Sequence, residues 1–228
     1  MTEKGRFVVI EGSDGSGKTK QVELLTVWLE TNKIPFAVID FPRYEQSFHG
    51  ALVGRYLRGE FGSVQDVNPY LASLTYAGDR LEAKPKLQAW LLDGKLVVAN
   101  RYIGSNLAHM SAKLPNGERE AFIDWLKQLE YSIHQIPKED LTVFLYVPVD
   151  VAQKLIEQKG ERNYIGGKKK DIHEADIDFM RRSEEQFLYL AEKEPHWVVV
   201  ECVANGQILS PEEIHQKVID ILKSRGIV

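Results

Sequence analysis

Residues 12–19 have the types and spacing of a loop that binds the phosphates of a nucleotide. They read Gly-Ser-Asp-Gly-Ser-Gly-Lys-Thr, which matches the pattern G-x-x-x-x-G-K-[ST] in full. Glycines let backbone N–H groups close around phosphate oxygens, and a helix that follows the loop directs its positive end at the anion. Lys18 can reach the β- and γ-phosphates, and Thr19 can offer its hydroxyl to Mg²⁺. We therefore expect a nucleoside triphosphate and Mg²⁺ to bind at Gly12, Ser13, Asp14, Gly15, Ser16, Gly17, Lys18 and Thr19.

Three arginines further along the chain are suited to a second anionic ligand. Arg43 and Arg101 come shortly after apolar segments that read as strands, and Arg80 lies in a helical pattern four residues after Tyr76. Arginine makes bidentate contacts to phosphate, and an aromatic ring beside a cation can stack a base. Each residue alone fits a surface charge or a core-edge tyrosine equally well. Two arginines after parallel strands, near a phosphate loop, favour a second phosphorylated substrate.

The signatures of a GTP-binding switch protein are missing. The base-reading pattern N-K-x-D has a near match at residues 32–35, where Pro35 replaces the carboxylate, and no D-x-x-G follows the apolar segment that ends at Asn100. A module that hydrolyses ATP slowly and changes partners stays open as an alternative, less favoured because of the arginines.

Five short apolar segments must position these residues, and they read as buried strands. They are rich in Val, Ile, Phe and Leu without strict alternation, as in strands covered on both faces. They lie at residues 6–12, 36–41, 95–100, 141–147 and 196–202. Helical patterns lie between them, and two of these place apolar residues on one face: Val22, Leu25 and Leu29 in the first, and Ile214, Val218 and Ile221 in the last. This alternation predicts one α/β domain over residues 1–228, a doubly wound five-stranded parallel sheet of the P-loop type, with ligands at the carboxyl ends of the strands.

Composition narrows the class of protein. The chain has 228 residues, a formal charge of −4 and a single cysteine, Cys202. The acidic balance argues against a nucleic-acid partner, and no intrachain disulfide can form. No segment predicts a signal peptide or a membrane span. We expect a cytoplasmic protein with small-molecule ligands and neither a nucleic-acid nor a membrane partner.

Residues 160–173 differ from the rest of the chain. The segment is polar and basic and holds two adjacent glycines, which is typical of a mobile loop, and a long helical pattern begins at Glu174. We expect a mobile loop at this position.

Along nearly its whole length the chain resembles thymidylate kinases, the P-loop nucleoside monophosphate kinases that phosphorylate dTMP. The resemblance depends on "FPRY" at 41–44, "YAGDR" at 76–80, "NRYIGSNLAH" at 100–109 and the helix after the basic lid. The phosphate loop is shared with many enzymes, whereas this combination is far more specific.

The resemblance implies roles for individual residues. Tyr76 is expected to stack on thymine, Arg80 to bond its O4, and Asn106 to lie at the edge of the base. Phe41, Arg43 and Tyr44 are expected around the monophosphate, and Arg101 between the donor and acceptor phosphates. Asp14 corresponds to a carboxylate near the sugar 3′-hydroxyl and the catalytic cations, and Asp171 and Glu174 to acidic residues that close the lid.

Three positions depart from the pattern that the resemblance implies. Gly15 stands where some family members carry an arginine, so lid cations, Arg162 and Lys168 with Lys169 and Lys170, are expected to supply that charge. Asn100 stands where an aspartate helps to hold Mg²⁺, so a weakened metal site is expected at Thr19 and Asn100. His109 stands where the family often has a tyrosine that packs against deoxyribose. The resemblance therefore does not establish that this chain discriminates between deoxyribose and ribose.

The resemblance implies transfer of the γ-phosphoryl group of ATP to dTMP, with Asp14, Lys18, Arg101, Arg162 and Lys168 as catalytic residues. Kinases for dUMP, UMP or a broader set of monophosphates are the nearest alternatives. A homodimer is also implied, and apolar residues in the helical stretch 48–60 (Ala51, Leu52 and Tyr56) are candidates for its interface.

Overall fold

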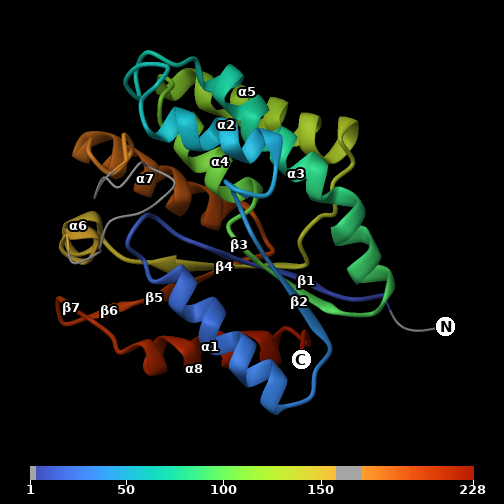
Figure 1. The fold of residues 1–228 in the computed structure, drawn as a ribbon. Coiled ribbons are helices and arrows are strands. Elements are labelled where there is room, and N and C mark those ends of the chain that lie inside the picture. The colour runs from blue at the N-terminus through green and yellow to red at the C-terminus, as the bar shows by residue number, and fades with distance from the viewer. Residues whose placement is uncertain (1–3, 158–170) are drawn as a thin grey trace.

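The protein is described by a computed structural model that covers residues 4–157 and 171–228 (Figure 1). Five parallel strands form its main sheet in the order β2-β3-β1-β4-β5. Their bounds are β1 Phe7–Glu11, β2 Phe36–Asp40, β3 Leu96–Asn100, β4 Leu141–Tyr146 and β5 Trp197–Glu201. Each strand lies within one of the five predicted segments, which confirms the predicted α/β parallel sheet.

Helices cover both faces of the sheet (Figure 1). One face packs against α1 (Lys18–Thr31) and α8 (Pro211–Ser224). The other packs against a larger layer, which contains α2 (Phe48–Leu57), α3 (Pro69–Leu92), α4 (Ile103–Ser111), α5 (Asn116–Lys127) and α7 (Ile177–Lys193). A short helix, α6 (Val149–Glu157), lies beside the phosphate loop at the carboxyl edge of the sheet. The strands are therefore apolar on both faces, which explains why their sequences do not alternate.

The predicted helix faces are correct with one exception. In α1, Val22, Leu25 and Leu29 are all buried. In α8, Ile214 and Val218 are buried, but Ile221 is only partly buried, and Leu222 occupies the inner position instead. Ile219 is buried as well, so the inner face of α8 consists of Ile214, Val218, Ile219 and Leu222.

The sequence analysis did not predict the π-helical segment or the small hairpin of the structure. Residues Gln128–Ile133 form a π-helical segment, η1, directly after α5. Strands β6 (Val203–Ala204) and β7 (Gln207–Ile208) form a small antiparallel hairpin whose turn, Asn205-Gly206, has φ values of 52° and 74°. Asn-Gly is a strong two-residue hairpin signal.

The interface candidates in α2 are only partly available. Ala51 is exposed and Leu52 partly buried, but Tyr56 is 2% exposed and belongs to the protein's own core. Tyr56 cannot serve a dimer interface, because its ring packs inward against His173 at a centroid distance of 5.4 Å.

The helix predicted from Glu174 begins three residues later, at Ile177. The side chain of Asp176 accepts a hydrogen bond from the backbone N–H of Phe179 (2.9 Å) and caps it. Residues 172–175 form a turn instead. Residues 160–170 of the expected lid, including Arg162 and Lys168, lie outside the described residues. Within the described residues, no helix combines the length and apolar character needed to cross a bilayer.

Candidate active site

The phosphate loop joins β1 to α1 and has the backbone that its glycines predict. Gly15 and Gly17 have φ values of 85° and 83°, in the left-handed region that favours glycine. A side chain at Gly15 would also collide with α6, because its Cβ would lie 2.7 Å from the carbonyl oxygen of Ala152. The position that carries an arginine in some family members is therefore closed to any side chain in this conformation.

Lys18 is buried beside the loop that precedes it. Its Nζ donates hydrogen bonds to the carbonyl oxygens of Gly12 (3.0 Å) and Ser13 (2.7 Å), and lies 3.4 Å from Oγ of Ser16. The ammonium group is thus held within the loop, where backbone N–H groups and the start of α1 attract anions.

Arg101 connects the end of β3 to the phosphate loop. Its Nη1 donates to the carbonyl oxygen of Gly12 (3.1 Å) and to Oγ of Ser105 (2.8 Å), and its Nη2 donates to the Asp14 carboxylate. The residue has a φ of 66°, which is uncommon for a side chain other than glycine, asparagine or aspartate. Such strained backbone clusters at functional sites.

Glu11 supports this arrangement, and sequence reasoning missed it. Its buried carboxylate accepts hydrogen bonds from the backbone N–H groups of Tyr102 and Ser105 (both 2.8 Å) and from Oγ of Ser105 (2.6 Å). Burial raises the pKa of Glu11, and the positive charge of Arg101 opposes that rise. Glu11 therefore joins β1 to the start of α4 and orients the Arg101 segment between them. An acidic residue at the end of a fully buried strand was the signal available in the sequence.

Two adjoining pockets lie at this edge of the sheet. The nucleotide pocket is lined by the phosphate loop, the ends of β2 and β3, and apolar residues of α6, β7 and α8. The acceptor pocket is lined by α3, α4 and the segment at 171–173. The residues that line both are Asp14, Phe41, Pro42, Tyr44 and Arg101. Ligands in the two pockets would therefore meet at Asp14 and Arg101.

Arg80 is buried at the inner end of the acceptor pocket. Its Nη2 donates to Oδ1 of Asn106 (2.7 Å) and to the Glu130 carboxylate, and its Nε also donates to Glu130 (2.8 Å). Its Nη1 makes one long contact, 3.4 Å, to the carbonyl oxygen of Tyr102. Tyr76 lines the same pocket. The structure therefore brings the predicted base-reading residues Tyr76, Arg80 and Asn106 together.

Glu130 is a second residue that sequence reasoning missed. It is fully buried in η1, 50 residues from Arg80, and no motif marks it. The charge of Arg80 is buried beside it, and a buried charge without a partner would be costly.

Arg43 is placed differently from its neighbours in the FPRY segment. Its Nε and Nη2 donate to Oδ1 (2.9 Å) and the carbonyl oxygen (2.7 Å) of Asp79, and its backbone N–H donates to Oδ2 of the same residue (2.8 Å). Phe41 and Tyr44 line both pockets, whereas Arg43 lines neither. Asp79 lines the acceptor pocket and fixes the position of the Arg43 guanidinium at its margin.

The two expected metal ligands lie beside each other. Nδ2 of Asn100 is 3.4 Å from Oγ1 of Thr19, and Oδ1 of Asn100 is buried without a hydrogen-bond partner among the described residues. Hydroxyl, amide and carboxylate oxygens are the ligands that Mg²⁺ prefers. Within the same described part of the chain, no three His, Cys, Asp or Glu side chains gather to hold a metal by themselves. The residues thus fit an ion that a nucleotide's phosphates also hold.

Two histidines line the acceptor pocket next to each other. The rings of His109 and His173 have centroids 5.5 Å apart, and Nε2 of His173 lies 3.0 Å from the Tyr56 hydroxyl. Burial lowers the pKa of His109 to about 4 and that of His173 well below its usual value. Both imidazoles are therefore neutral at pH 7. His173 was not singled out from the sequence.

The acidic residues expected at the lid are both buried. Oδ1 of Asp171 accepts from the backbone N–H groups of His173 and Glu174, both at 2.9 Å. Asp171 lines the acceptor pocket, but Glu174 does not. Glu174 instead lies 3.3 Å from the backbone N–H of Asp171, within the same turn.

Comparisons with known proteins identify similar sequences and a similar fold. Residues 10–218 match the family model described as thymidylate kinase. The chain is 30% identical over 226 residues to a probable thymidylate kinase of Pyrococcus horikoshii, covering 96% of this chain and 97% of that protein. It is 31% identical over 218 residues to a probable thymidylate kinase of Methanocaldococcus jannaschii, covering 96% of each. A solved structure of thymidylate kinase from Candida albicans superposes with a TM-score of 0.75 at 22% identity, over 98% of this chain and 93% of that one.

Proposed function

The chain belongs to the thymidylate kinase family, and on that premise we propose how its residues transfer the γ-phosphoryl group of ATP to dTMP, giving ADP and dTDP. The observation that carries this proposal is the pair Asp14 and Arg101, which faces both pockets. An oxygen of the dTMP phosphate bonds to the γ-phosphorus while the bond from that phosphorus to the β–γ bridging oxygen breaks. Because the attacking oxygen is already anionic near neutral pH, positioning and charge stabilisation do most of the work.

In the nucleotide pocket, residues 12–19 bind the ATP phosphates. Lys18 moves from the loop carbonyls to the β- and γ-phosphates, and Arg101 contacts the oxygens between donor and acceptor. Thr19 and Asn100 would hold Mg²⁺, which supplies charge neutralisation on the phosphates when bound. Arg162 and Lys168 are proposed to add cations from the lid. Exclusion of water by that segment would prevent hydrolysis of ATP.

In the acceptor pocket, Arg80 reads the thymine base. Its Nε and Nη2 hydrogens are directed at Glu130 and Asn106, so Nη1 has the N–H left for the exocyclic oxygen O4. Cytosine presents an amino donor at that position and would be disfavoured. Tyr76 stacks on the base, and Asn106 lies at its edge.

The remaining acceptor contacts concern the sugar and the phosphate. Asp14 and His109 lie where the sugar of dTMP would pass, and Phe41 and Tyr44 flank its phosphate. Arg43 reaches that phosphate from its position on Asp79.

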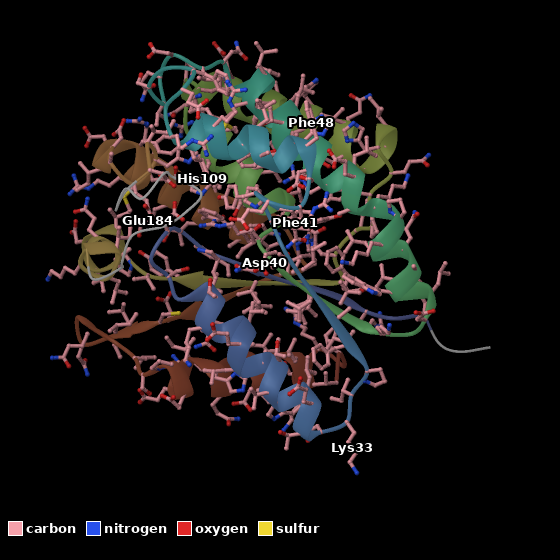
Figure 2. The ribbon with its side chains drawn as sticks, viewed as in Figure 1. Lys33, Asp40, Phe41, Phe48, His109 and Glu184 are labelled. Atoms are coloured by element: carbon pink, nitrogen blue, oxygen red, sulfur yellow. The ribbon has the colours of Figure 1, made fainter. Side chains whose placement is uncertain are left out.

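We propose that the enzyme is a homodimer that works in the cytoplasm. Support comes from exposed apolar side chains on α2 and α3, two helices that pack against each other where Gly78 leaves room for His49. Phe48 is 79% exposed, Leu71 64% and Leu74 44%, and Figure 2 shows Phe48 on the outside of this layer. Exposed apolar patches mark protein interaction sites, and we propose that these side chains form one.

A substrate panel tests the reaction. With labelled ATP and Mg²⁺, we expect labelled dTDP from dTMP, less product from dUMP and UMP, and least from dCMP. A preference for dUMP or UMP would favour the neighbouring kinase activity. Release of labelled phosphate at the same rate without any acceptor would favour a nucleotide-dependent ATPase instead.

A further inference from the structure

The carboxyl edge of the sheet holds a carboxylate to which nothing above has assigned a role. Asp40 ends β2 and lines the nucleotide pocket together with Thr19 and Asn100 (Figure 2). It is exposed, and it makes no hydrogen bond or ion pair within residues 4–157 and 171–228. A carboxylate without a partner beside a phosphate loop would repel a nucleotide unless a cation lies between them.

Strand register places Asp40 next to Asn100. The two residues are paired neighbours in the parallel ladder of β2 and β3, and neighbouring strands lie about 4.8 Å apart. Paired residues of adjacent strands point to the same face of a sheet. That face is the one covered by α1, because Val38 and Val98, two residues earlier in each strand, both pack in the core beneath α1 and α8. Thr19 lies in the first turn of α1, so all three side chains share one corner of the pocket.

The other carboxylates at this edge already have partners. Glu11 accepts three hydrogen bonds from the start of α4, and Asp14 forms an ion pair with Arg101. Asn100 contributes a neutral amide whose Oδ1 is buried and unpartnered among the described residues. The proposed Mg²⁺ site therefore has neutral oxygen ligands at Thr19 and Asn100. Within the described part of the chain, the nearest carboxylate without a partner is Asp40, on the neighbouring strand β2.

We propose that Asp40 supplies the carboxylate charge for Mg²⁺ that Asn100 does not, acting on the ion directly or through one of its waters. This role rests on the proposed function, because the ion is the one bound with ATP. Mg²⁺ keeps several of its waters in such sites, so a carboxylate on the neighbouring strand can act through them.

The test compares ADP binding with and without the metal. Calorimetry on the full chain measures the dissociation constant of ADP in excess Mg²⁺ and in EDTA. The constant in EDTA divided by the constant in Mg²⁺ is the ratio that reports how strongly the metal and the nucleotide favour each other's binding. We expect Asp40→Asn to lower this ratio about tenfold, the size of effect typical of groups that orient metal ligands. In EDTA the variant should bind ADP as well as the wild type or more tightly, since a repelling charge is gone.

Two further variants complete the experiment. Asn100→Asp should raise the ratio, and the double variant Asp40→Asn with Asn100→Asp should return close to the wild type, because the charge has only changed strands. Asp93→Asn is the matched control: it removes one exposed carboxylate at the opposite edge of the sheet, just before β3, and should leave the ratio unchanged.

The outcomes separate the two levels of the proposal. Normal ADP binding with an unchanged ratio in Asp40→Asn would overturn the role of Asp40 alone. Weaker ADP binding by equal factors in Mg²⁺ and in EDTA would also overturn it, because that result indicates a structural effect. Absence of any ADP binding by the wild type would overturn the proposed function together with this role.

Discussion

The Arg80 guanidinium donates from both Nε and Nη2 to one carboxylate oxygen of Glu130, and both side chains are buried. The residue expected to read the base is therefore held by a residue in a different helix, 50 positions later in the chain. Under the proposed function, selection of the acceptor would depend on this ion pair as well as on a contact between Arg80 and thymine.

Glu130→Gln should lower stability and relax base selection together. The variant leaves the Arg80 charge buried without its counter-charge, and breaking one partner of a buried pair typically costs about 3–5 kcal/mol. Urea unfolding measures the first effect, and the ratio of kcat/KM for dTMP over dCMP measures the second. Glu120→Gln, on the exposed side of α5, should change neither.

Arg80→Met combined with Glu130→Gln separates the two effects of that prediction. Removal of both charges should recover much of the stability, while discrimination against dCMP stays lost. If dTMP is still selected in the double variant, the base is read elsewhere.

Arg101→Ala should lose about 10²–10³ in kcat with the fold intact, as for removal of a single stabilising donor in other enzymes. Arg101→Gly should lose as much activity but unfold at a higher temperature than the alanine variant, because glycine adopts the φ of 66° without strain. Turnover near that of the wild type in either variant would remove Arg101 from the mechanism. Circular dichroism and thermal melts establish that both variants are folded.

His109 should make the protein less stable in mild acid. Its pKa is about 4 when folded and about 6.5 when unfolded, so the unfolded chain binds more protons between these values. The stability that the neutral imidazole confers is complete above pH 6.5 and declines as the pH falls toward 4.

His109→Gln should flatten that decline, measured as the midpoint of urea unfolding from pH 7.5 to 4. His173 shares the pocket and has a lowered pKa as well, so the double variant with His173→Gln should be flatter still. His196→Gln, at the start of β5, is the control. Equal slopes for the wild type and the double variant would contradict the assignment.

Leu74→Asp should convert a dimer to a monomer. The variant places a charge among the exposed apolar side chains of α2 and α3. Burying that charge against a second copy of the chain would cost free energy and so oppose dimer formation. Analytical ultracentrifugation across a range of concentrations measures the change. Leu92→Asp is the matched control, since Leu92 is 74% exposed at the far end of the same helix. Dissociation by the control alone would place the interface elsewhere.

The parts of this protein that the sequence predicted are those set by local physics. The apolar runs at 36–41 and 95–100 are strands because both faces are covered, and the glycines of the phosphate loop have the positive φ that a tight anion cradle needs. The metal positions Thr19 and Asn100 were implied by the family resemblance, and their side chains lie 3.4 Å apart.

The remaining features depend on tertiary contacts that have no local signal. Glu130 reaches Arg80 only because η1 follows α5 without a break, and Arg43 is positioned by Asp79, 36 residues away. The buried position of Tyr56 likewise depends on His173, 117 residues later. Spacing within the sequence carries no information about such pairs.

The five residues common to both pockets also bear on inhibitor design. Because Asp14 and Arg101 line both pockets, the pockets adjoin, and we expect one suitably long molecule to occupy both. Consider a molecule in which thymidine and adenosine are joined by a chain of phosphates. Once one end is bound, the other end would bind at a high effective concentration. The number of phosphates in the molecule that binds most tightly would then measure the distance between the donor and acceptor nucleosides.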